Sequence, residues 1–362
     1  MPNQRFDQRL RDLPPEIWNN ISRIDELKGQ WTAGAKLNPQ VLGRLKHSVL
    51  ITSTGASTRI EGARLSDADV EKLMNGISLQ KFTNRDKQEV KGYFELLRNV
   101  FNSWEHIRFS EGAIKHFHQE LLKYAEKDEG HRGEYKKKEN QVMMIDASGN
   151  PVGVLFDTTP AYLTPKAMLE LVEWAQSALK ENKYHPLLIV GSFIVEFLNV
   201  HPFEDGNGRL SRILTNLLLL KEGYLYIPYV SHEKLVEDNK LEYYAALRKS
   251  QKTFKPACRT GRGKKENIVP WLEFFLSVFL KQSRIAVDLL SAENIEKLLS
   301  PKQLAIWQYL RSVDEATPME ISKKTGVVRP TVNQALGRLL SFKKIERIGL
   351  GRSTRYRLIQ RD

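Results

Sequence analysis

Residues 201–212 read HPFEDGNGRLSR and decide how the middle of this chain folds. Apolar residues with helical spacing precede the stretch at 186–200 and follow it at 208–222. Glycine accepts backbone conformations that other residues avoid, so Gly206 and Gly208 allow a tight loop where the second helix begins. The first N–H groups of a helix bind anions. The stretch therefore predicts an anion-binding turn between two helices.

Four side chains of this stretch suit phosphate chemistry. Arg209 and Arg212 are three residues apart, so both project from one face of the helix. Arginine forks match phosphate oxygens, and Asp205 offers Mg²⁺ a hard oxygen ligand beside them. His201 can be neutral near pH 7 and accept a proton from an attacking hydroxyl. Alone, the histidine would be a structural cap and the glycines a plain turn. Together they predict a site of phosphoryl or nucleotidyl transfer.

The stretch matches the motif HPFx(D/E)GNGRxxR at every position, and the chain therefore resembles the Fic family. The resemblance covers residues 110–290 and extends to a hairpin around 141–156, to EYY at 242–244 and to WLEFF at 271–275. It implies a mainly α fold, a helical Fic-type domain with a β-hairpin flap. It also implies Mg²⁺-dependent transfer of AMP from ATP to a hydroxyl of a protein, with release of pyrophosphate.

The resemblance implies a role for each matched residue. His201 would be the general base that deprotonates the target hydroxyl, Phe203 would anchor the loop in the core, and Asp205 would hold Mg²⁺. The residues implied to bind the phosphates of ATP are Gly206, Asn207, Gly208, Arg209 and Arg212. The residues implied to bind its adenine are Tyr243, Tyr244 and Gln251.

A second match lies upstream, where STRIEG at 57–62 fits the inhibitory pattern (S/T)xxxE(G/N) of one class of the family. Ser57 and Glu61 are four residues apart and fall on one helical face, and Gly62 suits the end of that helix. By itself the pattern is weak, and a Ser and a Glu on a solvated helix would be the preferred interpretation. With the full motif downstream, the resemblance implies that Glu61 pairs with Arg212, takes the place of the γ-phosphate and leaves ATP in an unproductive pose. In some relatives the same glutamate positions a water that removes AMP.

The rest of the chain divides into three predicted parts. A helical region at 1–109 carries the inhibitory pattern, the catalytic domain spans 110–290, and a third domain spans 295–362. Within the second part, helices are expected at 165–179, 233–248 and 269–284, and another begins after Ser110 and ends near Gly130.

The hairpin consists of QVMMI at 141–145 and VGVLF at 152–156, which flank a Gly-Asn turn. We interpret it as a flap that binds a segment of the target protein by strand addition, with a plain structural ribbon as the alternative. The run of lysines at 136–138 before it is interpreted as a solvated surface, and His116, His118, His131 and His185 as structural or surface residues.

Residues 295–362 show three helical stretches at 301–313, 318–325 and 329–341, then two short strands joined by a glycine-containing turn, which indicates a winged helix-turn-helix. This part holds 14 Lys and Arg against 6 Asp and Glu, so +8 of the net charge of +13 lies here. The residues expected on its recognition helix and wing are Arg329, Thr331, Asn333, Gln334, Arg338, Arg352 and Arg355. Many winged helices bind protein, so DNA and protein both stay open as its partner.

The composition excludes several classes of protein. A chain of 362 residues predicts two or three domains, and 41% hydrophobic with 27% charged residues is ordinary for a globular protein. The single cysteine, Cys258, excludes a disulfide framework and a cysteine-built zinc site, and it fits the cytoplasm. No signal segment opens the chain, and its most apolar runs are short and carry glutamates, so neither export nor a membrane span is expected.

The sequence as a whole favours an autoinhibited protein adenylyltransferase that uses ATP and Mg²⁺ and modifies a Ser, Thr or Tyr hydroxyl. The rival from another class is a DNA-binding regulator whose Fic domain senses nucleotide with little turnover. The complete set of His201, Asp205, Arg209 and Arg212 argues against a catalytically dead domain. The sequence leaves open the target protein, the acceptor residue, removal of AMP, use of another nucleotide and assembly into a homo-oligomer.

Overall fold

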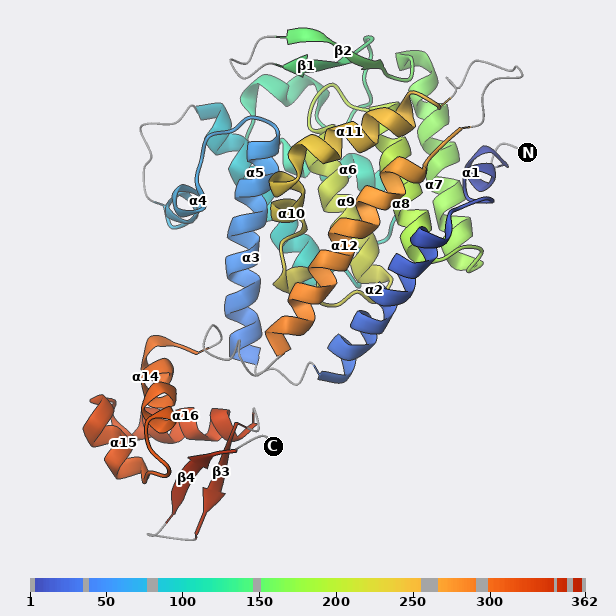
Figure 1. Ribbon diagram of the computed structural model, residues 1–362. Coiled ribbons are helices and arrows are strands. Elements are labelled where there is room, and N and C mark those ends of the chain that lie inside the picture. The colour runs from blue at the N-terminus through green and yellow to red at the C-terminus, as the bar shows by residue number, and fades with distance from the viewer. Residues whose placement is uncertain are drawn as a thin grey trace. The chain divides into compact units, whose positions relative to one another are not determined.

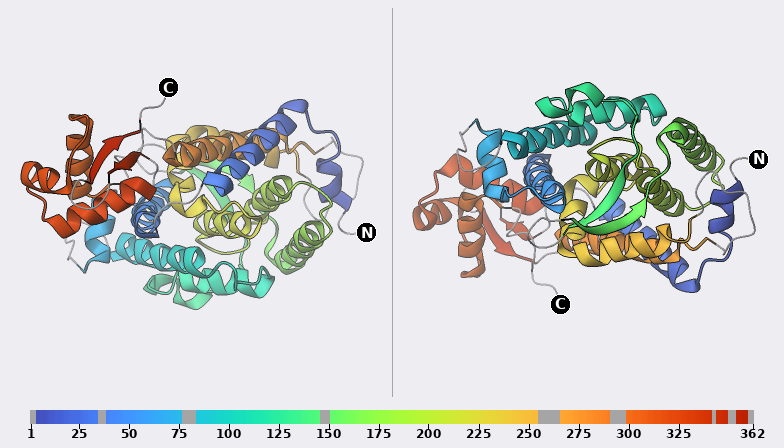
Figure 2. Two further views of the ribbon diagram at one scale, coloured as in Figure 1. Left: turned by 90° about the horizontal axis from the view of Figure 1, so that it is seen from below. Right: turned by 90° about the horizontal axis from the view of Figure 1, so that it is seen from above.

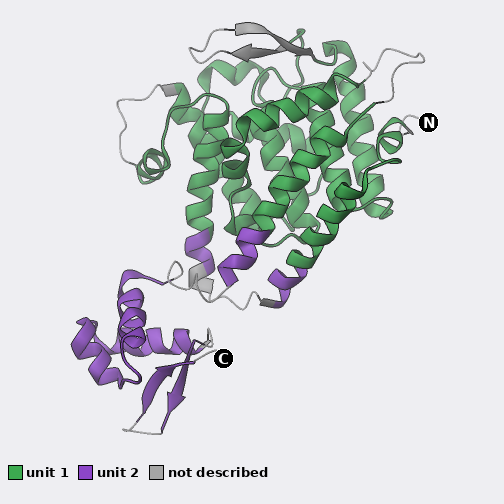
Figure 3. Ribbon diagram, in the orientation of Figure 1, with its two compact units in different colours: residues 1–28, 46–283 green, residues 29–45, 284–362 purple. Residues whose placement is uncertain are grey.

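The structure is a computed structural model that describes residues 4–34, 39–76, 84–145, 151–254, 266–290, 299–341, 344–349 and 354–359. The chain divides into two compact units (Figure 3). Unit 1 comprises Met1–Lys28 and Lys46–Ser283, and unit 2 comprises Gly29–Leu45 and Arg284–Asp362. The motif at 201–212 therefore lies within unit 1, and so do all the residues of the site described below.

The described residues of unit 1 are mainly helical (Figure 1). The helices that lie in it wholly or in large part are α1 (Gln4–Arg9), α2 (Pro15–Gly34), α3 (Pro39–Ile60), α4 (Asp67–Met74), α5 (Asn84–Ser103), α6 (Glu111–Leu121), α7 (Thr164–Lys180), α8 (Pro186–Val200), α9 (Asn207–Lys221), α10 (His232–Asp238), α11 (Lys240–Gln251) and α12 (Val269–Leu290). Short 3₁₀ turns lie at Glu126–His131, Ala161–Leu163 and Ile227–Tyr229.

Helices α8 and α9 form the centre of unit 1. Every residue of α8 from Leu187 to Leu198 is buried, and so is every residue of α9 from Arg209 to Leu220. Both helices are therefore surrounded by other elements, which a helix buried on all sides requires. Figure 2 shows α5 and α6 on one side of this pair and α12 on the other. The turn that joins α8 to α9 is therefore held at the end of two helices that cannot shift freely.

The predicted hairpin is present next to these helices. Strands β1 (Gln141–Ile145) and β2 (Pro151–Asp157) pair antiparallel, with Met143 opposite Val154. The register shifts just before Met143 and again just after Met144. The predicted Gly-Asn turn between the strands lies outside the described residues. Strand β2 lies close to α11, so the hairpin belongs to unit 1.

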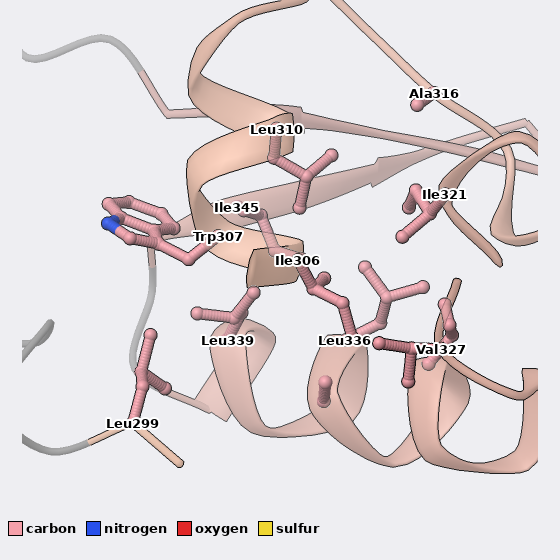
Figure 4. Close-up of a cluster of buried hydrophobic side chains, with 12 residues drawn as sticks. Leu299, Ile306, Trp307, Leu310, Ala316, Ile321, Val327, Leu336, Leu339 and Ile345 are labelled. Atoms are coloured by element: carbon pink, nitrogen blue, oxygen red, sulfur yellow. The ribbon is translucent and has the colours of Figure 1, made fainter. Parts of the chain in front are cut away.

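Unit 2 contains α14 (Pro301–Arg311), α15 (Pro318–Thr325), α16 (Arg329–Ser341), β3 (Ile345–Ile348) and β4 (Arg355–Leu358). Strands β3 and β4 pair antiparallel, and Ala316 forms a further bridge with Tyr356. Apolar residues of all three helices and of β3 share one core, which includes Ile306, Ile321 and Leu336 (Figure 4). The predicted three helices and terminal strands are thus present, although Arg352 lies outside the described residues.

Three predictions about helices are wrong in detail. The run 233–248 is two helices, because Asn239 has φ −120° and ψ 36° between α10 and α11. The helix that Ser110 caps ends at Leu121 and not near Gly130. Arg338, expected on the DNA-reading face of α16, is buried and donates from Nη1 to Gln303 Oε1 at 2.6 Å. Its guanidinium is part of the packing between α14 and α16.

No helix in the described part of the chain is both long and apolar enough to cross a membrane. The predicted domain boundary at residue 109 stays a prediction, because the residues next to it on both sides lie in unit 1.

Candidate active site

The turn between α8 and α9 has a fixed shape. His201 adopts the left-handed conformation, with φ 52°, and its N–H still donates to the carbonyl of Phe197 at 2.9 Å. Gly206, with φ 78°, caps the N-terminus of α9. Asn207 closes the turn through its side chain, because Oδ1 accepts from the N–H of Phe203 at 3.0 Å and Nδ2 donates to the carbonyl of Phe203 at 2.8 Å. The asparagine of the motif therefore holds the turn together.

His118 supports the turn from α6. Its ring stacks on Phe203 with centroids 3.8 Å apart, and Phe203 is fully buried, as an anchor for the loop should be. Nδ1 accepts from the N–H of Gly133 at 2.9 Å, so Nε2 carries the proton and donates to the carbonyl of Asp205 at 3.0 Å. Burial lowers the pKa of His118 to about 4, which keeps the ring neutral at pH 7. His118 is therefore structural, as predicted, and it supports the turn that carries the site residues.

His201 itself is neutral in this position. Burial of the imidazole and the positive charge of Lys136 together lower the pKa of His201 to about 4. At neutral pH the ring therefore has a nitrogen that can accept a proton, which a general base requires.

Asp205 lies between two guanidinium groups. Its Oδ2 accepts from Arg209 Nη2 at 2.8 Å and from Arg85 Nη2 at 3.0 Å. Burial would raise the pKa of Asp205, but Arg209 and Arg85 outweigh it and hold the pKa below its usual value. The carboxylate is ionised at neutral pH, and 37% of its side chain is exposed.

Arg209 is held by a residue that sequence reasoning missed. Its Nη1 lies 2.9 Å from Glu89 Oε2 on α5, and Glu89 Oε1 accepts from Arg85 Nε at 2.8 Å. The guanidinium of Arg209 is thus fixed by Asp205 of its own turn and by Glu89 of a distant helix. No sequence signal marks Glu89 or Arg85, because their spacing to the motif depends on how α5 packs.

Arg212 contacts both residues of the upstream pattern. It donates from Nε to Ser57 Oγ at 2.8 Å, from Nη2 to the Ser57 carbonyl at 3.0 Å and from Nη2 to Glu61 Oε1 at 2.7 Å. Ser57 lies in the last turn of α3, and Glu61 follows the end of that helix at Ile60. The structure therefore brings these three predicted residues together within unit 1.

The carboxylate of Glu61 lies over the first turn of α9. A Cβ atom at Gly208 would collide with Glu61 Oε1 and lie 3.1 Å from its Cδ. The beginning of a helix carries partial positive charge and favours anions there. The carboxylate of Glu61 thus lies beside the N-terminus of α9, and a larger residue at 208 would displace it.

The Fic/DOC family model matches residues 108–219, which include this turn, His118 and both arginines of the motif. Residues 108–219 of this chain form a Fic/DOC domain.

Similar proteins agree with this family. The chain is 26% identical over 264 residues to a "Probable protein adenylyltransferase" of Aquifex aeolicus, which covers 68% of this chain and 75% of that protein. It is 32% identical over 206 residues to a "Protein adenylyltransferase Fic" of Drosophila mojavensis, covering 56% of this chain but only 38% of that protein. A crystal structure of a Fic family protein from Desulfovibrio desulfuricans has a TM-score of 0.62 with 24% identity, over 97% of this chain and 98% of that one, which shows a shared fold.

The residues implied to bind adenine are brought together only in part. Tyr243 lines a small cavity, together with Arg212, His232 and Trp271. Tyr244 packs against Tyr243, with ring centroids 5.1 Å apart, but does not line this cavity. Gln251 is buried at the far end of α11, and its amide has no hydrogen-bond partner among the described residues. The Fic site in this structure therefore groups Tyr243, but not Gln251, with Arg212.

Lys136 corrects the interpretation of the lysine run. It is buried, with 3% exposure, while Lys137 and Lys138 are exposed as expected. The burial of Lys136 could not be predicted, because the sequence does not distinguish one lysine of a run from the next.

Proposed function

We propose that this Fic-family protein adenylyltransferase, so assigned by homology, transfers AMP from ATP to a Ser, Thr or Tyr hydroxyl of a target protein. The hydroxyl oxygen attacks the α-phosphorus, its proton passes to His201, and the bond to the β-phosphate oxygen breaks to release pyrophosphate. The observation that carries this proposal is the position of His201 in the turn that leads into the N-terminus of α9, where burial lowers its pKa and leaves the imidazole neutral at pH 7.

The residues of the first turn of α9 suit the triphosphate. The N–H groups of residues 206–208 and the positive end of the helix favour phosphate oxygens. Arg209 and Arg212 are both buried and charged, and Nη1 of Arg212 finds no acceptor in the described ranges of the chain. A guanidinium group can donate two parallel hydrogen bonds to phosphate oxygens. The two arginines would therefore orient the bond between the α-phosphorus and the leaving oxygen.

Asp205 fits a magnesium ion. The described residues contain no cluster of three or more His, Cys, Asp or Glu that would hold a metal by themselves. Mg²⁺ is commonly bound by one or two carboxylates together with the phosphates of the substrate, which an ionised, partly exposed Asp205 allows. When bound, the ion would neutralise charge on the phosphates. Asp205 would hold it, and Arg85 would have to give up its contact with Oδ2.

Replacing Asp205 with asparagine should remove the effect of Mg²⁺ on ATP binding. We expect Mg²⁺ to strengthen ATP binding about tenfold in the wild type and less than about twofold in Asp205→Asn, because the ion loses its protein carboxylate. Calorimetric titration with and without Mg²⁺ measures this. Glu204→Gln is the matched control, because Glu204 is the exposed neighbouring carboxylate. An unchanged response to Mg²⁺ in Asp205→Asn would assign the ion to another ligand.

We also propose that Glu61 inhibits the transfer. Its contacts with Arg212 and Gly208 support this role, because a carboxylate there competes with a phosphate of ATP for the same charges. A carboxylate beside the reacting phosphate would also suit the orientation of a water for removal of AMP, which a chase of labelled protein would detect.

The second proposed function concerns unit 2, whose three helices and two strands we interpret as a winged helix that binds duplex DNA. Arg329, Asn333 and Gln334 are exposed on α16, where a recognition helix would present them to a groove. The alternative is a docking site for protein.

If unit 2 binds DNA, affinity of the full chain for duplexes should fall steeply with salt, because each neutralised phosphate releases counterions. We expect Arg329→Ala to weaken binding and to reduce the slope of log K against log salt by about 1. Lys302→Ala, which removes an exposed cation of α14, is the control and should change neither. A failure to bind any duplex at low salt would leave docking of a protein.

A further inference from the structure

Lys136 is a buried ammonium group with a full set of partners. Its Nζ donates to Thr158 Oγ1 at 2.7 Å, to Asn140 Oδ1 at 2.8 Å and to the carbonyl of Val200 at 3.1 Å. A buried ammonium is costly unless all of its protons are bonded, and here three acceptors match three protons. The contrast with the exposed Lys137 and Lys138 shows that this position, and not the charge of the run, determines its burial.

The acceptors and neighbours of Lys136 lie on both sides of His201. The carbonyl of Val200 accepts from Nζ, and the carbonyl of Pro202 accepts from the backbone N–H of Lys136 at 2.8 Å. Asn140 continues the series, because its Nδ2 donates to the carbonyl of Phe203 at 3.0 Å. The short segment 136–140 therefore holds the peptide groups before and after the histidine.

This support matters because His201 has a conformation that most residues avoid. A left-handed φ of 52° at a residue other than glycine carries strain and persists only where the surroundings hold it. The contacts nearest to it include the bond of its N–H to Phe197 inside α8 and the bonds from the segment 136–140 just described.

The same lysine contacts both ends of the hairpin. Asn140 directly precedes β1, and Thr158 directly follows β2. Thr158 Oγ1 lies 2.8 Å from the carbonyl of Asn140, so the two chain ends are bonded to each other as well as to Nζ. Both ends of the hairpin are therefore bonded to one polar cluster of Lys136, Asn140 and Thr158.

We propose that Lys136 is a positioning residue that joins the base of the β1–β2 hairpin to the turn carrying His201. Through this cluster, a segment bound along the hairpin and the imidazole that receives its proton are kept in a fixed relation. The consequence for turnover rests on the proposed function, whereas the mechanical connection does not.

The test uses the full chain with Lys136→Met, which keeps length and removes the three donors, Lys136→Arg, and Lys137→Met as the matched exposed control. Amide hydrogen exchange is followed at residue 136, His201 and Phe203. We expect exchange to rise about tenfold at these amides in Lys136→Met, with no change inside α8, and no rise in Lys137→Met. Lys136→Arg, which retains donors, should restore part of the protection.

Steady-state kinetics supply the second readout. We expect kcat for AMP transfer to fall about 100-fold in Lys136→Met with KM for ATP nearly unchanged, because misplacement of the base affects the reaction and not nucleotide binding. Unchanged exchange at His201 and Phe203 would overturn the proposal, and so would an even rise throughout unit 1. If the Glu61→Gly variant transfers no AMP, the proposed function fails, while the exchange result still decides about Lys136.

Should Lys136→Met not fold, Thr158→Val removes one partner of Nζ at similar size. It should raise exchange at the same amides by a smaller factor, and no rise there would count against the proposal.

Discussion

Replacing Glu61 with glycine is expected to raise AMP transfer at least about tenfold. Without the carboxylate, Arg212 and the N-terminus of α9 are free to bind the triphosphate. Loss of a half-buried carboxylate from a working enzyme ordinarily lowers activity, so a gain is hard to obtain by general damage. The measurement is incorporation of label from α-labelled ATP into the protein itself or into target protein.

Two further variants make this result specific. Glu61→Gln keeps the size of the side chain and removes its charge, so it should also raise transfer, whereas Glu71→Gln alters an exposed glutamate of α4 and should not. Adding a substitution of His201 should abolish the gain, which assigns the effect to the same site. Equal or lower transfer in Glu61→Gly, with ATP still bound, would mean that Glu61 and Arg212 form only a structural ion pair.

Loss of the base should have the opposite effect. We expect His201→Ala to lower transfer by about 100- to 10,000-fold, the usual contribution of a general base, while ATP binding survives. Alanine also disturbs the left-handed turn, so His201→Asn is the sharper variant, since asparagine tolerates that conformation. His106→Ala, at an exposed position after α5, is the control.

The pH dependence of the wild type follows from the lowered pKa of His201. The base form is present above a pKa of about 4, so transfer should be insensitive to this group near neutrality and should fall as pH drops through that value. Near wild-type transfer by His201→Asn would contradict the assignment of the base.

The parts of the site formed by residues close together in the sequence could be predicted. The glycines and the arginines of 201–212 act within one turn and the helix it opens, so their spacing alone indicates an anion site. The contact of Glu61 with Arg212 spans a long stretch of chain, and only the resemblance to the Fic family made it an expectation.

Other contacts could not be predicted because they arise from packing. Glu89 reaches Arg209 from α5, His118 reaches Phe203 from α6, and Lys136 is selected from a run of three lysines by the turn it lies beside. The break between α10 and α11 at Asn239 could not be predicted either. The apolar pattern continues in phase from α10 into α11, so periodicity gives no sign of the change in chain direction.

The central claim, transfer of AMP, is tested most directly by the position of the label that enters protein. The Glu61→Gly variant is incubated with ATP labelled at the α-phosphate in one reaction and at the γ-phosphate in another, with Glu61→Gly/His201→Asn beside each. We predict that α label enters protein, that γ label does not, and that the double variant incorporates neither. Entry of γ label would indicate phosphate transfer, and bound ATP with neither label incorporated would favour a nucleotide-sensing regulator. Either result would contradict the function proposed for this Fic protein.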